Sequence, residues 1–472
     1  MGSSDSYDLV IVGLGPAGLY AGWRLATTDP EHTILGKPAH ALRVGLFETQ
    51  PESQVGGRLC TQPMPGYPFL AELGGMRYRD TQLLVKGLVR ALGLSEQVRP
   101  FAFPQYFYYL RGRRLLEQQL KTKSRNPYHL AETEGNRLPA DLIAEAIHNI
   151  LRDLDFGLAF SKSRAASWGI KPRELLDKIR TPSGIRELTH REWAVVKCLA
   201  EYHSENFLYD VGFWDLLQFY LSSEAWHLAH DGLGYESIMG NWNAAIALPW
   251  FLSDFSSDKA FTLTEGMSSI TRKMHQVILR TSNYECEYDW DLTGIDISTD
   301  SGDSTSPTFH LQFGTPDRTV TSITTRAVVL ALPKGALIRH NYGKDLIARA
   351  HAPHTSLDKR SWFMDQLNSV DGKALFKLFL GYDKPWWQTR GVKSATGKVN
   401  TDLPLRQVFY YGPDKWSERR ALELGLDISK NSHSMLMASY SVSHYIEFWS
   451  ELERRKAWLP YYAGADGGAS LS

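Results

Sequence analysis

The sequence predicts a mixed α/β fold in which a nucleotide-binding domain is interleaved with a β-sheet domain and a helical domain. Residues 8–12 form a short β-branched strand that is followed at once by a glycine-rich turn and a helical segment. A continuous apolar strand ended by proline, residues 326–333, comes much later and suits the same parallel sheet. Between the two, residues 138–252 have mostly helical apolar spacing. The domains are therefore expected to be interleaved.

Three glycines after the first strand have the spacing of a dinucleotide-binding turn. Gly13 permits the tight turn, Gly15 lets the backbone approach a pyrophosphate, and Gly18 lets the next helix pack close to the strand. The helix begins near Pro16 and continues through Ala17 to residue 26, so its N-terminal amides face the phosphates. This strand, turn and helix predict a Rossmann-like domain.

The next strand, residues 43–48, ends in an acid. Glu48 stands where a carboxylate accepts hydrogen bonds from an adenosine ribose, although it comes later than the usual ~20 residues after the turn. A solvated glutamate at the end of a strand is the alternative. A surface loop at residues 27–42 would account for the delay. Gly56 and Gly57 then allow backbone amides to face a phosphate, and Arg58 adds positive charge.

A second pair of glycines precedes a second arginine. Gly74 and Gly75 imply close backbone approach to a flat or anionic group, and Met76 and Arg77 follow directly. Arg77 could reach into the same space, and a surface arginine is the alternative. Further on, residues 375–382 read as a strand in which Lys377 shares a face with apolar side chains. A buried lysine near a cofactor is a functional candidate, with an edge-strand lysine as the alternative.

The helical region is rich in aromatic and histidine residues. Helices are expected at residues 142–151, 186–199 and 213–221. The region's aromatic and histidine side chains could line a cavity or form a core: Trp214, Trp226, His227, His230 and Trp242. The two histidines lack a carboxylate or cysteine partner at ligand spacing, so no metal site is predicted.

Composition excludes several classes of protein. The formal net charge is zero, which gives no electrostatic case for a nucleic-acid or anionic-membrane partner. The 3 cysteines are far apart and form no redox or metal motif. No apolar run approaches the length of a membrane span, and no signal peptide is visible. We therefore expect a cytoplasmic protein or leave its compartment unassigned.

These motifs, in this order, resemble the flavin-dependent L-amino-acid oxidases of the monoamine oxidase superfamily. The resemblance rests on Gly13-x-Gly15-x-x-Gly18, Glu48, Gly56-Gly57-Arg58 and the segment from Glu72 to Arg77. It extends through Glu265-Gly266-Met267, the strand at 329–333, Lys377-x-Phe379, Pro385-Trp386-Trp387, Asp402-Leu403-Pro404 and Tyr410-Tyr411. It covers most of the chain, although the helical region matches only in character.

The resemblance implies FAD as the cofactor and an L-amino acid and O2 as substrates. FAD would be bound by Gly13, Gly15, Pro16, Ala17, Gly18, Glu48, Gly57 and Arg58, with Gly74, Gly75, Met76 and Arg77 at the isoalloxazine. Arg77 would clamp the substrate α-carboxylate, Tyr410 would add a hydroxyl to it, and Lys377 would hold a water against the flavin N5.

The reaction implied is oxidative deamination to a 2-oxo acid, ammonia and hydrogen peroxide. A flavin amino-acid 2-monooxygenase, which releases an amide and carbon dioxide, is the nearest alternative. An amine or polyamine oxidase and a non-enzymatic binding module are the others.

A length of 472 residues is expected to hold two or three domains. Family members also carry a further flavin-binding Gly-Glu segment, which is not found after the strand and helix at 434–458. We expect either a truncated chain or, preferably, proteolytic cleavage, with a second chain completing the FAD site and a homo-oligomer of that unit. The predicted domains are FAD-binding residues 1–75 and 256–335, substrate-binding residues 76–137 and 336–440, helical residues 138–255, and residues 441–472 as the start of an incomplete C-terminal FAD-binding part.

Overall fold

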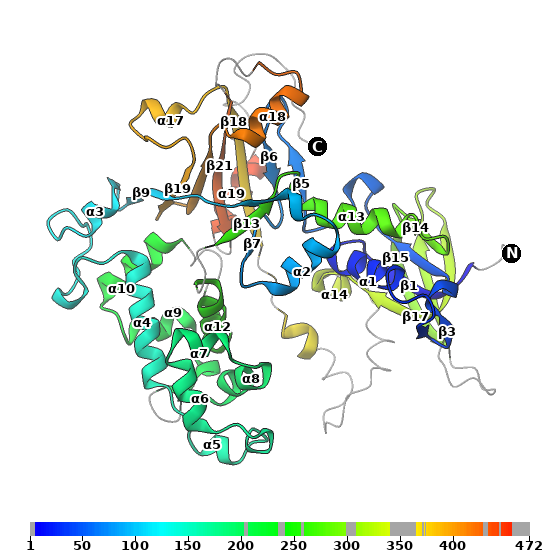
Figure 1. The fold of residues 1–472 in the computed structure, drawn as a ribbon, viewed down its shortest axis with the longest axis horizontal. Helices are drawn as coiled ribbons and strands as arrows, with labels where there is room; N and C mark the ends of the chain where they lie inside the picture. The colour runs from blue at the N-terminus through cyan, green and yellow to red at the C-terminus, as the bar shows by residue number, and fades with distance from the viewer. Residues whose placement is uncertain are drawn as a thin grey trace.

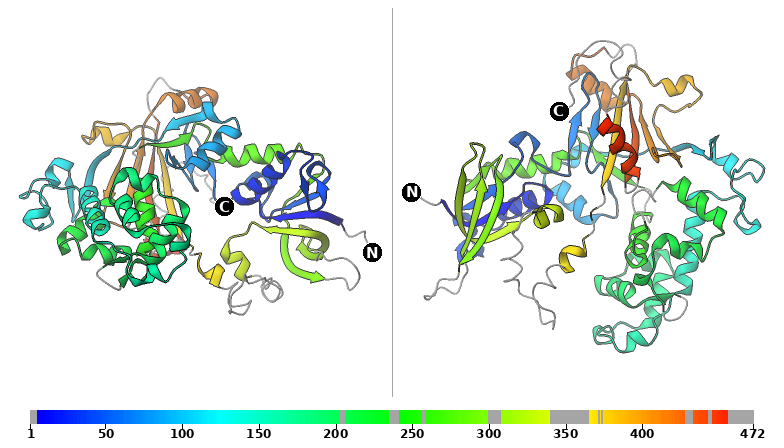
Figure 2. Two further views of the ribbon diagram at one scale, coloured as in Figure 1. Left: turned by 60° about the horizontal axis from the view of Figure 1, so that its bottom comes forward. Right: turned by 180° about the vertical axis from the view of Figure 1, so that it is seen from behind.

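The computed structural model describes residues 5–202, 206–234, 241–255, 259–298, 308–339, 365–370, 372, 374–427, 433–442 and 445–455. Figure 1 shows one sheet at the right, a second sheet at the centre and a group of helices at the lower left. The view from behind in Figure 2 shows the same helical group apart from the first sheet.

The first sheet combines strands from both ends of the sequence. Its order is β14-β4-β1-β17-β16-β15. The central strand β1 pairs in parallel with β4 on one side and β17 on the other, so the predicted strand at 8–12 and its parallel partner are confirmed. The strands are β1 (Asp5–Val12), β4 (Val44–Phe47), β14 (Tyr284–Glu287), β15 (Asp291–Ser298), β16 (Thr308–Gly314) and β17 (Val320–Leu330).

Two helices cover one face of this sheet. Helix α1 (Pro16–Ala26) starts and ends where the sequence predicted, with Pro16 in its first turn. It packs beside α13 (Ser268–Ile278), and Leu19, Leu46 and Met274 belong to the apolar core beneath them. A second core, which includes Phe47 and Phe313, lies on the other face. Burial on both faces explains why the strands β1 and β4 are so apolar.

The end of β17 is less buried than predicted. Residues 327–330 are half-buried, although the sequence indicated a fully buried strand. In the described part of the chain, β16 pairs with β17 only as far as Thr325, so the last residues of β17 have a strand neighbour on the β1 side alone. This one-sided pairing explains the partial exposure.

The second sheet is mostly antiparallel, with the order β10-β9-β19-β20-β21-β18. Among its described strands, only β9 and β19 run in parallel. The predicted strand at 375–382 is confirmed, and Lys377 in it lies opposite Tyr440. The strands are β9 (Gln105–Leu110), β10 (Arg113–Leu115), β18 (Leu375–Tyr382), β19 (Gly397–Thr401), β20 (Gln407–Tyr411) and β21 (Ser434–Val442).

Small sheets and short helices connect these parts. A three-stranded sheet consists of β7 (Tyr78–Arg79), β13 (Ala260–Leu263) and β8 (Val98–Pro100). Three hairpins are formed by β2 (Thr33–Ile34) with β3 (Lys37–Pro38), β5 (Thr61–Pro63) with β6 (Leu70–Glu72), and β11 (Glu201–Tyr202) with β12 (Asn206–Phe207). Helices outside the helical group are α2 (Leu83–Ala91), α3 (Glu117–Leu120), α14 (Lys334–Arg339), α17 (Trp386–Thr389), α18 (Lys415–Glu423) and α19 (Tyr445–Arg455).

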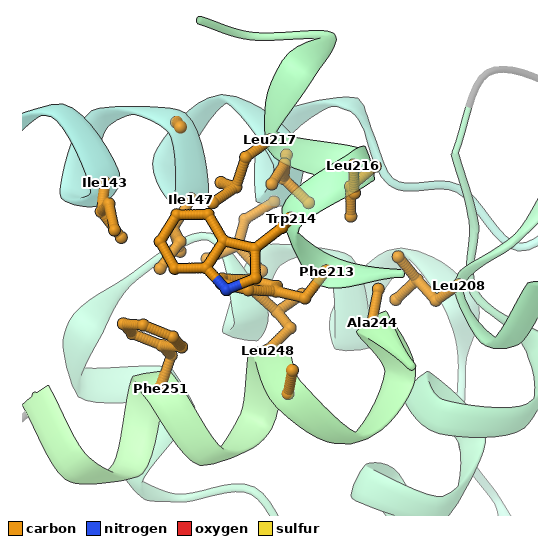
Figure 3. Packing of buried hydrophobic residues seen from close by; sticks show 14 of the residues in the cluster. Ile143, Ile147, Leu208, Phe213, Trp214, Leu216, Leu217, Ala244, Leu248 and Phe251 are labelled. Atoms are coloured by element: carbon orange, nitrogen blue, oxygen red, sulfur yellow. The ribbon is translucent and has the colours of Figure 1, made fainter. Parts of the chain in front are cut away.

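The helical group has its own apolar core. Figure 3 shows Trp214 surrounded by Ile147, Phe213, Leu217 and Phe251. Trp214 is fully buried there, and Trp226 and Trp242 pack against the same core, so the core interpretation of these residues holds. The helices are α4 (Pro139–Asp153), α5 (Leu158–Ser161), α6 (Pro172–Ile179), α7 (Pro182–Arg186), α8 (His190–Leu199), α9 (Phe213–Gln218), α10 (Ser223–Leu233) and α12 (Ala244–Phe255).

The predicted helix at 186–199 starts later than expected. The chain first completes α7, and Thr189 then caps α8, its side chain accepting a hydrogen bond from the backbone N–H of Glu192 at 3.2 Å. None of the helices described in the structure has the length and apolarity needed to cross a membrane.

Candidate functional site

The glycine turn between β1 and α1 is shaped for close backbone packing. Gly13 has a φ of +93°, and a Cβ there would lie 2.8 Å from the carbonyl oxygen of Ala331. A Cβ on Gly18 would lie 1.9 Å from the carbonyl oxygen of Gly13. A Cβ on Gly15, in contrast, would meet nothing within 4 Å, so the space beside Gly15 is open. The structure thus makes Gly13 and Gly18 tightly packed positions and leaves open space beside Gly15.

A cavity of about 530 Å³ lies at this turn. No side chain caps the N-terminus of α1, whose cap residue is Gly15, so its first amides are available to an anion. Glu48 also lines the cavity, and its carboxylate accepts hydrogen bonds from the backbone N–H of Leu14 at 2.6 Å and of Gln50 at 3.0 Å. The predicted residues that line this cavity are Gly13, Gly15, Pro16, Ala17, Glu48, Gly57 and Arg58.

A second cavity, of about 670 Å³, continues from the first. Gly57 and Arg58 line both. A Cβ on Gly57 would lie 3.1 Å from the Cα of Gly15, which shows how closely the two glycine loops approach. The second cavity is also lined by Gly74, Gly75, Met76, Arg77 and Lys377. The structure therefore brings the two glycine-arginine segments and Lys377 together along one elongated space.

The Nζ atom of Lys377 is bound to the loop that carries the second glycine pair. It donates hydrogen bonds to the carbonyl oxygens of Glu72 at 2.9 Å and Gly74 at 2.5 Å. Burial, and to a lesser degree the positive charge of Arg77, lowers the pKa of Lys377 to about 8. Burial raises the pKa of the Glu72 carboxyl, which accepts hydrogen bonds from Thr61 Oγ1 and from the backbone N–H of Met267, each at 2.8 Å.

Arg77 lies between this cavity and a third one. The third cavity, of about 880 Å³, shares Arg77 and Arg79 with the second. The guanidinium of Arg77 lies 5.2 Å from the centroid of the Phe101 ring. Phe409 and Lys398 line the third cavity as well. An arginine at this junction can face both a group in the second cavity and a ligand in the third.

Tyr410 is a correction to the predicted site. Its side chain is 3% exposed and packs in a core with Trp387 and Val399. That core lies on the face of the second sheet that points away from Met76. Side chains alternate along β20, so Phe409 packs with Met76 and Met437 on the other face. Tyr411 shares that face and lines a further cavity of about 340 Å³ with Met76 and Phe101. The hydroxyl near the Arg77 side of the sheet is therefore that of Tyr411.

Sequence reasoning missed Lys398 and Trp250, which line the third and second cavities respectively. Lys398 has the same signal as Lys377, because it is a lysine within a strand whose neighbours are buried. Trp250 carries no such signal, since it is one of three aromatic residues in an apolar helix. The helical-group residues named as cavity candidates do not line the four cavities described: Trp214, Trp226, His227, His230 and Trp242.

No group of three or more His, Cys, Asp or Glu side chains in the described part of the chain could hold a metal ion. The Nδ1 atom of His230 lies 3.2 Å from a carboxylate oxygen of Asp231, and its ring stacks on Trp226 at 4.8 Å.

The residues present fit an extended dinucleotide with a flat ring. The open space at Gly15, the uncapped start of α1 and the charge of Arg58 suit a pyrophosphate. The second glycine pair is equally constrained, since a Cβ on Gly74 would lie 2.0 Å from the carbonyl oxygen of Arg58. The shared lining of the two cavities gives room for one ligand along both. FAD has this shape and charge.

Comparison with known proteins also indicates a flavin-binding protein. The chain is 24% identical to Achacin of Lissachatina fulica over 423 residues, which is 86% of this chain and 66% of Achacin. It is 20% identical to an L-amino-acid oxidase of Echis ocellatus over 411 residues, 86% of this chain and 65% of that protein. The chain thus spans slightly less than two thirds of the length of each relative.

A solved structure from Exiguobacterium sp. 255-15, named for a protoporphyrinogen oxidase, has a TM-score of 0.44 and 16% identity, covering 93% of this chain and 77% of that chain. The family of flavin containing amine oxidoreductases has a sequence model that matches residues 16–467. That match covers nearly the whole chain, from the first residue of α1 through the second glycine pair and Lys377, and the chain belongs to the family of flavin-containing amine oxidoreductases.

Proposed function

We propose that this chain carries the flavin and substrate site of an L-amino-acid oxidase, which converts an L-amino acid and O2 to a 2-oxo acid, ammonia and hydrogen peroxide. The observation that carries the proposal is the position of Arg77, at the junction of the second and third cavities and two residues after Gly75. The name of the relative from Echis ocellatus supports the same substrate class.

FAD is held, in this proposal, along the first two cavities. The glycine turn and α1 bind the pyrophosphate, Glu48 lies at the ribose, and Gly74 and Gly75 lie against the ring. Bound FAD would supply the redox chemistry, the two-electron oxidation of the substrate at its α-carbon at the expense of O2. The chain's own residues position the substrate and exclude water.

Arg77 binds the α-carboxylate. A guanidinium has a planar fork that matches a carboxylate in two parallel hydrogen bonds, and it stays protonated at any physiological pH. The ring of Phe101 lies beside the guanidinium, with its centroid 5.2 Å away. An amine substrate without a carboxylate would gain nothing from an arginine here.

Lys377 is proposed to hold a water molecule in the second cavity. Two of the three N–H donors of its ammonium group bind the carbonyl oxygens of Glu72 and Gly74. The third donor remains for a water beside the ring. The pKa of the ammonium group is lowered to about 8, which is close to neutral pH, so the group can give up a proton during the reaction.

The experiment is a screen of substrates with the full-length, FAD-loaded protein. Peroxide release, together with a 2-oxo acid and ammonia, is expected with at least one L-amino acid and not with its D-enantiomer. An amide with carbon dioxide as products would indicate a 2-monooxygenase instead. Peroxide release from amines or polyamines, with none from any amino acid, would overturn the proposal.

A further inference from the structure

The third cavity is strongly cationic. Its described lining includes Arg77, Arg79, Lys259 and Lys398, and none of its described lining residues is acidic. The remaining described walls are mostly apolar and include the aromatic rings of Phe101 and Phe409. A substrate with a purely apolar side chain would not favour this set of charges, because its binding would remove charged groups from water without pairing them. The cavity therefore has the composition of a site for an anion with an apolar stem.

Lys398 is the least expected of these cations. It stands in β19 directly opposite Phe409 of β20, so it belongs to the face of the sheet that carries Met437 and Phe409 rather than Tyr410. Within the described part of the chain, no hydrogen bond or ion pair is recorded for its Nζ atom. Burial, and then the charges of Arg77 and Arg79, lowers the pKa of Lys398 to about 8. Lys398 is half-buried, and an ammonium group that is partly removed from water without an anionic partner is stabilised by a ligand that supplies the anion.

The two lysines bracket Arg77. Lys377 and Lys398 lie on strands separated by β20 and β21, on one face of the same sheet. Strands are about 4.8 Å apart, so the two positions are roughly 14 Å apart across the sheet. The charge of Arg77 acts on both lysines and lowers the pKa of each. A substrate carboxylate at Arg77 thus has Lys377 on one side and Lys398 on the other.

The geometry points to a substrate with a second anionic group: an L-amino acid whose side chain ends in a carboxylate. This inference rests on the proposed function. The α-carboxylate binds Arg77, the α-carbon faces the second cavity and Lys377, and the side chain extends into the third cavity, where Lys398 pairs with its terminal carboxylate. The Phe101 and Phe409 rings pack against the methylene groups between.

The test compares acidic amino acids with their neutral amides. The FAD-loaded protein is assayed for peroxide release with L-glutamate, L-aspartate, L-glutamine, L-asparagine, L-leucine and L-phenylalanine. The expected order places an acidic amino acid first in kcat/KM. In Lys398→Met, the ratio of kcat/KM for L-glutamate to that for L-glutamine is expected to fall about 10- to 100-fold, the worth of a charge-assisted hydrogen bond. Lys393→Met, at an exposed lysine nearby, is the matched control and keeps the wild-type ratio.

A binding measurement removes the dependence on turnover. Glutarate and pentanoate differ only in the second carboxylate, and calorimetric titration into the FAD-loaded protein is expected to show tighter binding of glutarate. Lys398→Met is expected to abolish that difference, and Lys398→Arg is expected to retain part of it. Thermal unfolding of each variant checks that the fold is intact.

The outcomes separate the two proposals. Peroxide from leucine or phenylalanine in preference to every acidic amino acid would overturn this inference and leave the proposed function standing. An equal loss for L-glutamate and L-glutamine in Lys398→Met would also overturn it, because Lys398 would then only attract carboxylates in general. No peroxide with any amino acid would contradict the proposed function itself.

Discussion

The Nζ atom of Lys377 donates a hydrogen bond to the carbonyl oxygen of Gly74 at 2.5 Å, and this bond joins strand β18 to the loop that carries Arg77. A second hydrogen bond, to the carbonyl oxygen of Glu72 at 2.9 Å, fixes the same loop. The lysine therefore orients the glycine pair from the far end of the sequence. The second cavity and the arginine at its edge are therefore held by two hydrogen bonds between segments that are distant in the chain.

Replacing Lys377 with Met is expected to lower kcat about 100-fold with a smaller effect on KM. The variant loses a proton-carrying group whose pKa is tuned towards neutrality, and positioned groups of this kind contribute about 10²–10⁴-fold. Anaerobic stopped-flow measurement of flavin reduction gives the affected step. Lys384→Met, at an exposed lysine, is the control. An unchanged rate of flavin reduction in Lys377→Met would leave Lys377 with a structural role only.

Gly15→Ala and Gly18→Ala are expected to fail in different ways. Gly15 has extended backbone angles, φ −71° and ψ −176°, that alanine adopts easily, and its Cβ would enter open space. That variant should fold with an unchanged unfolding temperature but bind FAD about 10-fold more weakly or worse, because the methyl group occupies the phosphate position. The Cβ of Gly18→Ala would lie 1.9 Å from the carbonyl oxygen of Gly13, so the fold itself should be destabilised.

Flavin absorbance after purification and circular dichroism of the flavin-free protein distinguish these two failures. Full FAD occupancy in Gly15→Ala would show that the open space at the turn does not receive the pyrophosphate.

The local parts of this fold could be predicted from the sequence, and the contacts across the sheets could not. Helix α1 was predicted to the residue because Pro16 and the glycines are local signals. Tyr410 and Tyr411 are adjacent, and choosing between them requires knowing which face of β20 meets Met76. The partial exposure at the end of β17 likewise depends on where its partner β16 begins. Such information lies in the pairing of distant strands.

Arg77→Ala is expected to lower kcat/KM for an L-amino acid by about 100- to 1,000-fold. Removing the guanidinium leaves the substrate carboxylate without its charged partner, a loss of a few kcal/mol of transition-state stabilisation. Arg77→Lys keeps the charge but loses the planar fork, so it should recover only part of the rate. The matching amine, which lacks the carboxylate, serves as the comparison substrate. Equal effects of Arg77→Ala on the amino acid and the amine would argue against a carboxylate clamp.

Tyr410→Phe and Tyr411→Phe should have opposite consequences for the site. The hydroxyl of Tyr410 is buried without a hydrogen-bond partner in the described structure, so its removal should leave kcat/KM unchanged and stability unchanged or about 1 kcal/mol higher. Tyr411 lines a cavity with Met76. Burial raises its pKa and the nearby charge of Arg77 acts in the opposite direction, so Tyr411→Phe is expected to lower kcat/KM about 10-fold. The measurement is kcat/KM of both variants. A loss in Tyr410→Phe with no change in Tyr411→Phe would mean that Tyr410, and not Tyr411, contacts the substrate.

Lys398→Met is expected to stabilise the protein at neutral pH and to lose that advantage in alkali. Burial, Arg77 and Arg79 lower the pKa of Lys398 from an ordinary value of 10.5 to about 8, against a weaker opposite effect of Glu117. Between these two values the unfolded chain binds more protons at this residue than the native protein does. The free energy of unfolding of the wild type should therefore rise with pH across that window.

One pKa unit corresponds to about 1.4 kcal/mol, so the charge of the half-buried Lys398 costs at most about 3–4 kcal/mol below pH 8. Lys398→Met removes this cost, and its free energy of unfolding in urea should exceed that of the wild type by about 1–3 kcal/mol at pH 7 but by less than about 1 kcal/mol at pH 10. The effects of other titrating groups are common to both proteins and cancel in the difference. A difference that stays constant between pH 7 and pH 10 would mean that Lys398 keeps an ordinary pKa, and its ammonium group would then already be solvated or paired without any ligand.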